Sequence, residues 1–253
     1  MISRLDRNQT LFHLALHFLH NLMPHSWFTE IRLLCQKYRL PEPLVLLTSP
    51  PNKAKFKLQT KSAVISFWHK KLCAEVSEKL SLKFLRCNFI LLGRSPHLIW
   101  TSSRGSPTRV KAATLQAKIL CGTYRSDALL SKWTGDTEAC SLPSCSASVG
   151  DIVHLLSGSC PALKVPLEKT VLRGLNTLLP YPFLYNFTLS ALSKSPLDWA
   201  IFIADPSTEP EIIFYRQENG DKSIYPLMQF ARSFICTMHR THFHLRGLSY
   251  FLR

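Results

Sequence analysis

Several patterns that would quickly place a chain among enzymes or membrane proteins are missing from this sequence. No apolar run reaches the roughly 18 residues that a membrane-spanning helix needs. A Gly-rich phosphate loop, a Gly-x-Ser-x-Gly nucleophile turn and a pair of adjacent aspartates are all absent. We therefore expect a protein that neither crosses a membrane nor catalyses a reaction.

Acidic residues are scarce and unevenly distributed. The 253 residues include 31 Lys and Arg against 16 Asp and Glu, a formal net charge of +15. Residues 1–135 contain 21 basic and 6 acidic side chains, whereas residues 136–253 contain 10 of each. Positive charge concentrated in one half favours a polyanionic partner, and nucleic acid before membrane because no lipid-anchor motif is present. The alternative is a basic protein with no dedicated partner, whose charge serves solubility.

The first apolar stretch and the cysteines bear on the cellular compartment. His13, His17 and His20 interrupt that stretch and make it a poor secretory signal. We therefore expect an intracellular protein, nuclear or cytoplasmic, whose eight cysteines are thiols or metal ligands and not disulfides.

Apolar periodicity predicts a mainly α fold, an irregular helical assembly with a small Cys/His insertion. We divide the chain into a basic helical region (1–105), a helix followed by the Cys/His module (106–165) and a C-terminal helical region (166–253). Residues 96–107 are predicted to be a loop, and 199–203 are a possible short strand. Proline and capping signals bound the predicted helices, which cover 10–21, 28–39, a longer segment after Asn52, 108–120, 128–133, 167–179, 210–219 and 225–248.

One constellation carries chemistry. Cys140-x4-Cys145-x8-His154-x5-Cys160 offers four soft or borderline ligands within 21 residues. A closed, tetrahedral structural zinc site requires such a set, and with no open position the metal would serve folding and not catalysis. The alternative is that the three cysteines are buried or incidental thiols and that His154 is a surface residue.

The other cysteines and histidines give weaker signals. The three histidines of residues 10–21 share the polar face of a predicted helix, without a carboxylate or thiol beside them. The histidines near the C-terminus lie among arginines, which favours a basic surface. The residues concerned are His239, His242 and His244, and the cysteines predicted to be core thiols are Cys35, Cys73, Cys87, Cys121 and Cys236.

Four segments together resemble a known family. They are RVKAATLQAKILCGTYRSDAL (109–129) with the Cys/His stretch after it, SWFTEIRLLCQKYRLPEPLVLLTSPP (26–51), KSAVISFWHKKLCAEV (61–76) and ARSFICTMHRTHFHLRGL (231–248). They are similar, in the same order, to the region after the polymerase core of non-LTR (LINE-type) retrotransposon reverse transcriptases. The family's zinc-knuckle ligands would fall on Cys140, Cys145, His154 and Cys160, although the family more often has two residues between its first two cysteines.

The resemblance implies a carboxy-terminal appendage that binds template RNA or target DNA and helps to position it for the polymerase. Reverse transcription needs paired aspartates for two metal ions, so this chain is expected not to polymerise. A protein-interaction or scaffold role, with docking onto the polymerase core, and a decayed copy without selected function are the alternatives.

Around the predicted knuckle, basic side chains are the expected phosphate contacts, giving affinity without much sequence selectivity. Tyr124 and Trp133 are candidates for stacking on unpaired bases, or else core aromatics. The expected contacts are Arg109, Lys111, Lys118, Arg125 and Lys132, followed by Arg104 and the cluster Lys53, Lys55 and Lys57.

Overall fold

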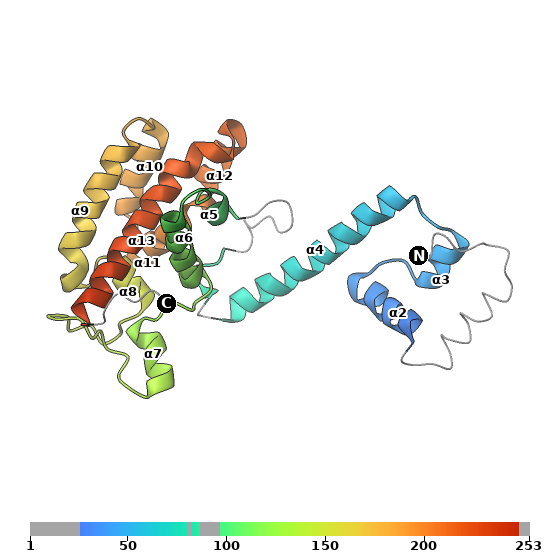
Figure 1. Ribbon diagram of the computed structural model, residues 1–253, viewed down its shortest axis with the longest axis horizontal. Helices are drawn as coiled ribbons and strands as arrows, with labels where there is room; N and C mark the ends of the chain where they lie inside the picture. Colours follow the sequence, from blue (N-terminus) through green and yellow to red (C-terminus); the bar gives the residue numbers. More distant parts are fainter. Residues whose placement is uncertain (1–25, 80–81, 87–96, 248–253) are drawn as a thin grey trace. The chain divides into compact units, whose positions relative to one another are not determined.

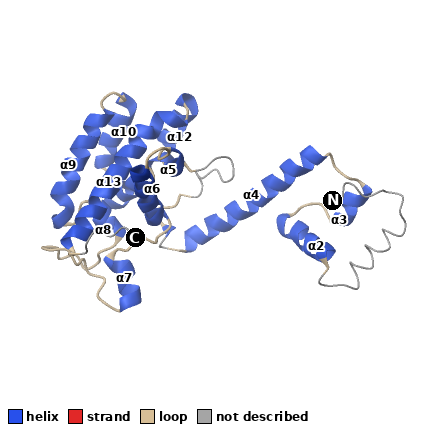
Figure 2. Ribbon diagram, viewed as in Figure 1, coloured by secondary structure: helices blue, strands red, loops and turns tan. Residues whose placement is uncertain are grey.

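The computed structural model describes residues 26–79, 82–86 and 97–247. Helix is the only regular secondary structure among them (Figure 2), which confirms the mainly α prediction. The predicted helix at 10–21, with its three histidines, and Cys87 lie outside the described residues. No helix in the described part of the chain is long and apolar enough to cross a membrane.

The chain forms two compact units, Met1–Glu75 and Val76–Arg253. The division therefore does not fall at residue 105 or 165, where the three sequence regions were separated. The predicted Cys/His module and the C-terminal helices belong to the same unit. Their buried side chains also form one continuous core.

The N-terminal unit contains α2 (Trp27–Tyr38), α3 (Pro43–Thr48) and most of α4 (Lys53–Glu78), shown in blue to cyan in Figure 1. The Ser26 hydroxyl accepts a hydrogen bond from the Thr29 amide and caps α2, as its position before the first apolar residue indicates. None of the described side chains of α4 is buried. The apolar side chains of this helix are therefore at most half-buried in the structure.

The second unit is built from short and medium helices (Figure 1). The longest, α13, packs against α9, α6 and α11, so it forms the centre of this unit. The helices are α5 (Leu98–Thr101), α6 (Pro107–Leu120), α7 (Asp127–Thr134), α8 (Ile152–Leu156), α9 (Pro161–Leu178), α10 (Pro182–Leu192), α11 (Pro196–Ala204), α12 (Pro210–Asn219) and α13 (Tyr225–Leu245), with 3-10 turns at Pro206–Thr208 and Asp221–Ile224.

Proline determines where many of these helices begin. α6, α9, α10, α11 and α12 each have proline as their first residue. Proline suits this position because its missing N–H would have no partner within the helix and its fixed φ is already helical. This explains how a helical protein accommodates 16 prolines.

Three sequence predictions are corrected by the structure. The possible strand at 199–203 is helical, within α11, because its side chains are buried on several sides and a short apolar run does not distinguish the two structures. The predicted loop 96–107 contains the short helix α5. α9 begins at Pro161, six residues before the predicted start, because Leu163 and Leu167 anchor its first turns in the core despite the internal Pro166.

α9 and α13 approach each other closely at one glycine. A side chain at Gly174 of α9 would overlap the ring of Phe230 on α13. Glycine is therefore required at this crossing, and the contact fixes the distance between the two helices.

Candidate metal centre

A tight turn brings the first two cysteines together. The Cys145 amide donates a hydrogen bond to the Leu142 carbonyl (3.2 Å), Pro143 is the second residue of the turn, and Ser144 has φ of 61°. These are the features of a type II turn, which favours proline at its second position and requires positive φ at its third. The Cys140 amide then donates to Ala147 (3.1 Å) and closes the loop behind the turn.

His154 is presented by the short helix α8. The Asp151 carboxylate caps this helix by accepting a hydrogen bond from the His154 amide (2.8 Å), and it also pairs with Lys83 (3.1 Å). Cys160 follows the helix and is itself the N-cap residue of α9. A thiolate at this position is favoured by the partial positive charge of the helix N-terminus.

The four predicted ligands converge on one point. Cys140 Sγ lies 4.0 Å from Cys160 Sγ, and Cys145 Sγ lies 3.3 Å from His154 Nε2. All four donor atoms are within 4.8 Å of one another. A tetrahedral zinc ion, with Zn–S near 2.3 Å and Zn–N near 2.0 Å, separates its ligand atoms by about 3.5–3.8 Å. The observed spacing therefore fits a metal ion of this size and geometry.

The surroundings of the thiols also suit a cation. Burial raises the pKa of Cys140 to about 12. The backbone hydrogen bond from Leu142 acts in the opposite direction, because it favours the thiolate. Burial likewise raises the pKa of Cys160, against a backbone hydrogen bond from Ala162. Each of these two buried sulfurs faces an amide donor, and neighbouring Cys145 raises the pKa of both, so a divalent ion would stabilise them as thiolates.

Burial lowers the pKa of His154, although the carboxylates of Asp151 and Asp127 act in the opposite direction. A lowered pKa keeps the imidazole neutral near pH 7, which is the form that coordinates metal.

Asp127 fixes the cysteine loop from outside the ligand set. Its carboxylate is 5% exposed and accepts hydrogen bonds from the amide and hydroxyl of Ser141, both at 3.0 Å. It also pairs with Arg246, which follows α13 (3.2 Å). Gly150 passes so close that a Cβ there would lie 2.9 Å from both Asp127 Oδ2 and Cys140 Cα. The sequence indicated Asp127 only as part of a helix start, because its partners are distant along the chain.

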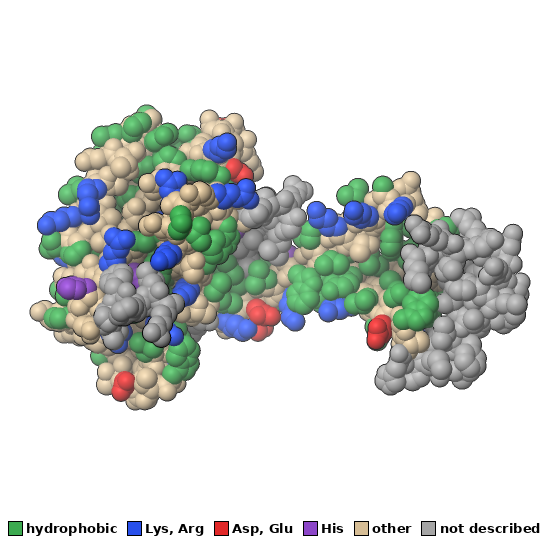
Figure 3. Space-filling model, viewed as in Figure 1, with side chains coloured by type: hydrophobic (Ala, Val, Ile, Leu, Met, Phe, Trp, Pro, Cys, Tyr) green, Lys and Arg blue, Asp and Glu red, His purple; other side chains and the backbone are tan. Residues whose placement is uncertain are grey.

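All the basic residues predicted to surround the knuckle are exposed. In Figure 3, basic side chains are spread over the visible face of the second unit, and acidic ones are few. The structure does not bring the set together at one point: Arg109 and Lys132 line separate hollows. Burial is the main cause that lowers the pKa of His239 on α13, and the nearby charge of Lys118 lowers it further. The exposed residues are Arg104, Arg109, Lys111, Lys118, Arg125 and Lys132.

Two of the predicted surface histidines are buried instead. His242 is fully buried and His239 nearly so, whereas His244 is exposed. Tyr124 packs beside these rings, and its hydroxyl lies 3.2 Å from His239 Nδ1. Tyr124 therefore belongs to the core and not to a base-stacking surface, whereas Trp133 is 70% exposed.

The remaining predicted core cysteines differ from one another. Cys35 is buried, as predicted, and Cys73 and Cys236 are half-buried. Cys121 is exposed, so the prediction is wrong there, because this residue follows the last turn of α6 and points away from the core.

No protein-family model, curated protein or solved structure matches this chain.

Proposed function

We propose that this chain is a non-catalytic nucleic-acid-binding fragment, of the kind that follows the polymerase core in LINE-type reverse transcriptases, and that a structural zinc ion stabilises it. The convergence of three sulfurs and one imidazole nitrogen within 4.8 Å carries the proposal. The four segments that resemble the retroelement family support the same assignment.

In this proposal Cys140, Cys145, His154 and Cys160 hold the zinc. The ion would supply charge neutralisation for the buried thiolates and a cross-link between α8, α9 and the cysteine loop. A set of four protein ligands leaves no position for substrate or water. The role of the metal is therefore to maintain the fold.

Nucleic acid would bind to the exposed basic side chains of the second unit through its phosphates. Arg109, Lys111 and Lys118 project from α6, and Arg125 and Lys132 lie on the following segment and α7. Contacts of this kind give affinity and depend strongly on salt, because bound counterions are released from the nucleic acid.

A scaffold function is the second candidate, and one observation favours it. Val165, Leu172 and Leu179 recur every seven residues along α9 and its end, and they are 54%, 64% and 57% exposed. A stripe of this kind is suited to contact with another protein, such as the polymerase core.

Metal analysis of the purified protein tests the zinc assignment. We expect one zinc per chain, lost in Cys140→Ser and retained in Cys121→Ser, which removes an exposed thiol outside the cluster. A folded, metal-free wild-type protein purified in the presence of zinc would refute the assignment.

Salt titration of RNA binding tests the nucleic-acid function. Affinity for a single-stranded RNA should fall steeply between low and moderate salt, with a logarithmic slope of about −0.7 for each phosphate neutralised. A combined Lys111→Gln, Lys118→Gln and Lys132→Gln variant should show a shallower slope than the wild type. If the wild type instead shows a flat salt response, or binds no RNA at low salt, the scaffold function is favoured.

A further inference from the structure

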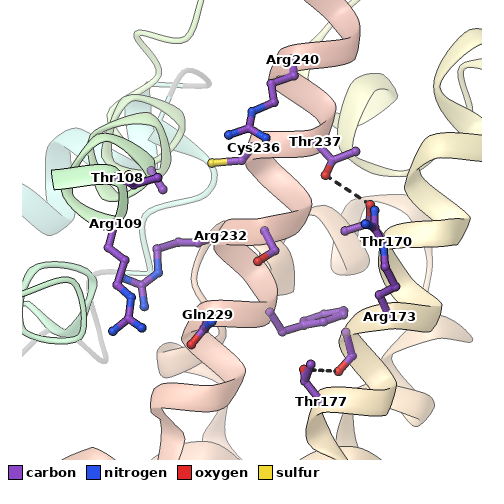
Figure 4. A pocket seen from close by; sticks show the side chains of 14 residues that line it. Thr108, Arg109, Thr170, Arg173, Thr177, Gln229, Arg232, Cys236, Thr237 and Arg240 are labelled. Carbon is purple, nitrogen blue, oxygen red and sulfur yellow. Dashed lines mark hydrogen bonds between the residues drawn. The ribbon is translucent and has the colours of Figure 1, made fainter. Parts of the chain in front are cut away.

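A groove lies between α6, α9 and α13, away from the cysteine cluster (Figure 4). It has a volume of about 410 Å³ and is lined by four arginines, Arg109 on α6, Arg173 on α9, and Arg232 and Arg240 on α13. Among the described residues, no acidic side chain lines the groove or forms an ion pair with these arginines. Four positive charges thus share one hollow without a counter-charge from the part of the chain that the structure describes.

Arg232 distinguishes this hollow from an ordinary basic surface. Its side chain is buried, with the residue only 4% exposed. Nε donates to the Met228 carbonyl (3.1 Å) and Nη2 donates to the Ser102 carbonyl (3.2 Å), which hold the guanidinium in place. Nη1 is buried and has no hydrogen-bond partner in the described structure. A buried, charged donor without a partner is costly, so its presence points to a ligand that accepts from it.

The electrostatics of Arg232 agree with this interpretation. Burial lowers the pKa of its guanidinium, and the positive charge of Arg109 lowers it further. In Figure 4 the two guanidinium groups lie on the same side of the groove. An anion between them would relieve both the desolvation of Arg232 and the repulsion from Arg109.

The rest of the lining provides room and neutral hydrogen-bonding groups. Gly174 and Phe230 meet at the groove, where the absence of a side chain on Gly174 lets α9 and α13 approach. The hydroxyls of Thr170 and Thr237 lie 3.2 Å apart across the two helices. Hydroxyls and guanidinium groups on a fixed framework are the groups that recognise phosphate oxygens.

We propose that this groove binds a phosphate group of a nucleic-acid strand, with Arg232 Nη1 as the central donor and Arg109, Arg173 and Arg240 around it. The assignment of the phosphate to nucleic acid rests on the proposed function, whereas the recognition of phosphate rests on the groove alone. Three of these arginines come from the half of the chain whose formal charges cancel.

Inorganic phosphate tests the recognition directly in the full chain. Millimolar phosphate should raise the Tm more than sodium chloride of equal ionic strength, and the difference should disappear in Arg232→Lys, which keeps the charge but not the guanidinium fork. If Arg232→Lys does not fold, a variant that changes the three exposed arginines of the groove replaces it, namely Arg109→Gln/Arg173→Gln/Arg240→Gln. An equal Tm in phosphate and chloride for the wild type would overturn the proposal.

Binding of a fluorescent single-stranded RNA tests the source of the phosphate. The triple arginine variant should lose about tenfold more affinity than Lys164→Gln/Lys169→Gln/Lys222→Gln, which removes the same charge from exposed positions outside the groove. Equal losses would overturn the nucleic-acid assignment of the groove. If the wild type responds to phosphate but binds no RNA, the proposed function fails while the phosphate site stands.

RNA with and without a 5′-phosphate separates an internal phosphodiester from a terminal phosphate. Equal affinity for the two is expected. A requirement for the terminal group would contradict binding of an internal phosphate.

Discussion

Helices α4 and α13 are both long and both carry several basic residues, but their surroundings differ completely. α4 has no buried residue among those described, and its lysines point into solvent. α13 buries ten residues, including Arg232, His239 and His242. The same kinds of side chain are therefore solvated on one helix and enclosed on the other.

This difference shows that the formal charge of a side chain does not indicate how much that side chain contributes to the free energy of unfolding. A solvated lysine interacts with its neighbours through water and contributes little to stability. An enclosed arginine or histidine depends on fixed partners, because each unsatisfied polar atom costs free energy. Substitutions should thus have large effects near α13 and small effects on α4.

The largest expected effect is at the cysteine cluster, which joins the helices around α13. Cys160→Ser removes a fully buried, proposed zinc ligand at the start of α9 and should lower the free energy of unfolding of the second unit by about 3 kcal/mol or more. Chemical denaturation in the presence of zinc measures this loss. Cys121→Ser is the matched control and should change stability by less than about 0.5 kcal/mol. Similar stabilities for the two variants would contradict a structural role for the metal.

The next effect concerns the crossing of α9 and α13. Gly174→Ala places a methyl group on the Phe230 ring and should destabilise the protein by about 1–3 kcal/mol. In an open helix the same change would be stabilising by roughly 1 kcal/mol, so the sign of the effect is diagnostic. Phe230→Leu in the same chain should recover part of the loss. A stabilising Gly174→Ala would show that the two helices are not in close contact.

A third effect, smaller and dependent on pH, is expected at His242. Burial is the main cause that lowers its pKa to about 4, opposed by Asp127 and assisted by Arg246 and His239. The unfolded chain would bind a proton near pH 6.5 and the folded chain only near pH 4. Protonation of His242 therefore does not reduce the free energy of unfolding above about pH 6.5. Between about pH 6.5 and pH 4 the free energy of unfolding falls, because the unfolded chain binds a proton that the folded chain does not.

His242→Leu separates this contribution from acid release of the proposed zinc ion. Both ring nitrogens of His242 lack a partner in the described structure, so an apolar side chain should be tolerated at pH 7. The variant should lose less stability than the wild type between pH 7 and pH 5, by on the order of 1 kcal/mol. Parallel unfolding curves for the two proteins over this range would show that His242 does not titrate as expected.

The smallest effect is expected on α4. The combined change of Lys53, Lys57 and Lys61 to Gln, all exposed, should alter the unfolding free energy by less than about 0.5 kcal/mol. Thermal unfolding followed by circular dichroism measures it. A loss of more than about 1 kcal/mol in the free energy of unfolding would show that the exposed lysines of α4 contribute to stability as the enclosed residues of α13 do.

Local signals in the sequence were sufficient for much of the fold. Ser106-Pro107 at the start of α6 indicated this helix because a cap and a proline act within one turn. The strand predicted at 199–203 was wrong because burial on several sides removes the periodicity that identifies a helix. The short helix α5 was missed because four residues carry almost no periodic signal.

The cysteine cluster and the arginine groove also differ in how far the sequence alone could predict them. The four proposed metal ligands lie within 21 residues, so their spacing alone indicated a common centre, and the structure brings them within metal-binding distance. Asp127 was missed because its role depends on contacts with Ser141 and Arg246, which no local pattern encodes. The arginine groove was missed because its residues come from three helices, two of them in a segment with no net charge.

Cys160 has a consequence that extends beyond the cysteine cluster, because this one residue is both a proposed ligand and the N-cap of α9. The helix that starts there carries Arg173 and Gly174 between three and four turns later. Oxidation of the thiol would therefore remove a proposed ligand and place a larger group, in a fully buried position, at the start of that helix. The redox state of one sulfur would thus act at the start of the same helix that supplies an arginine to the groove.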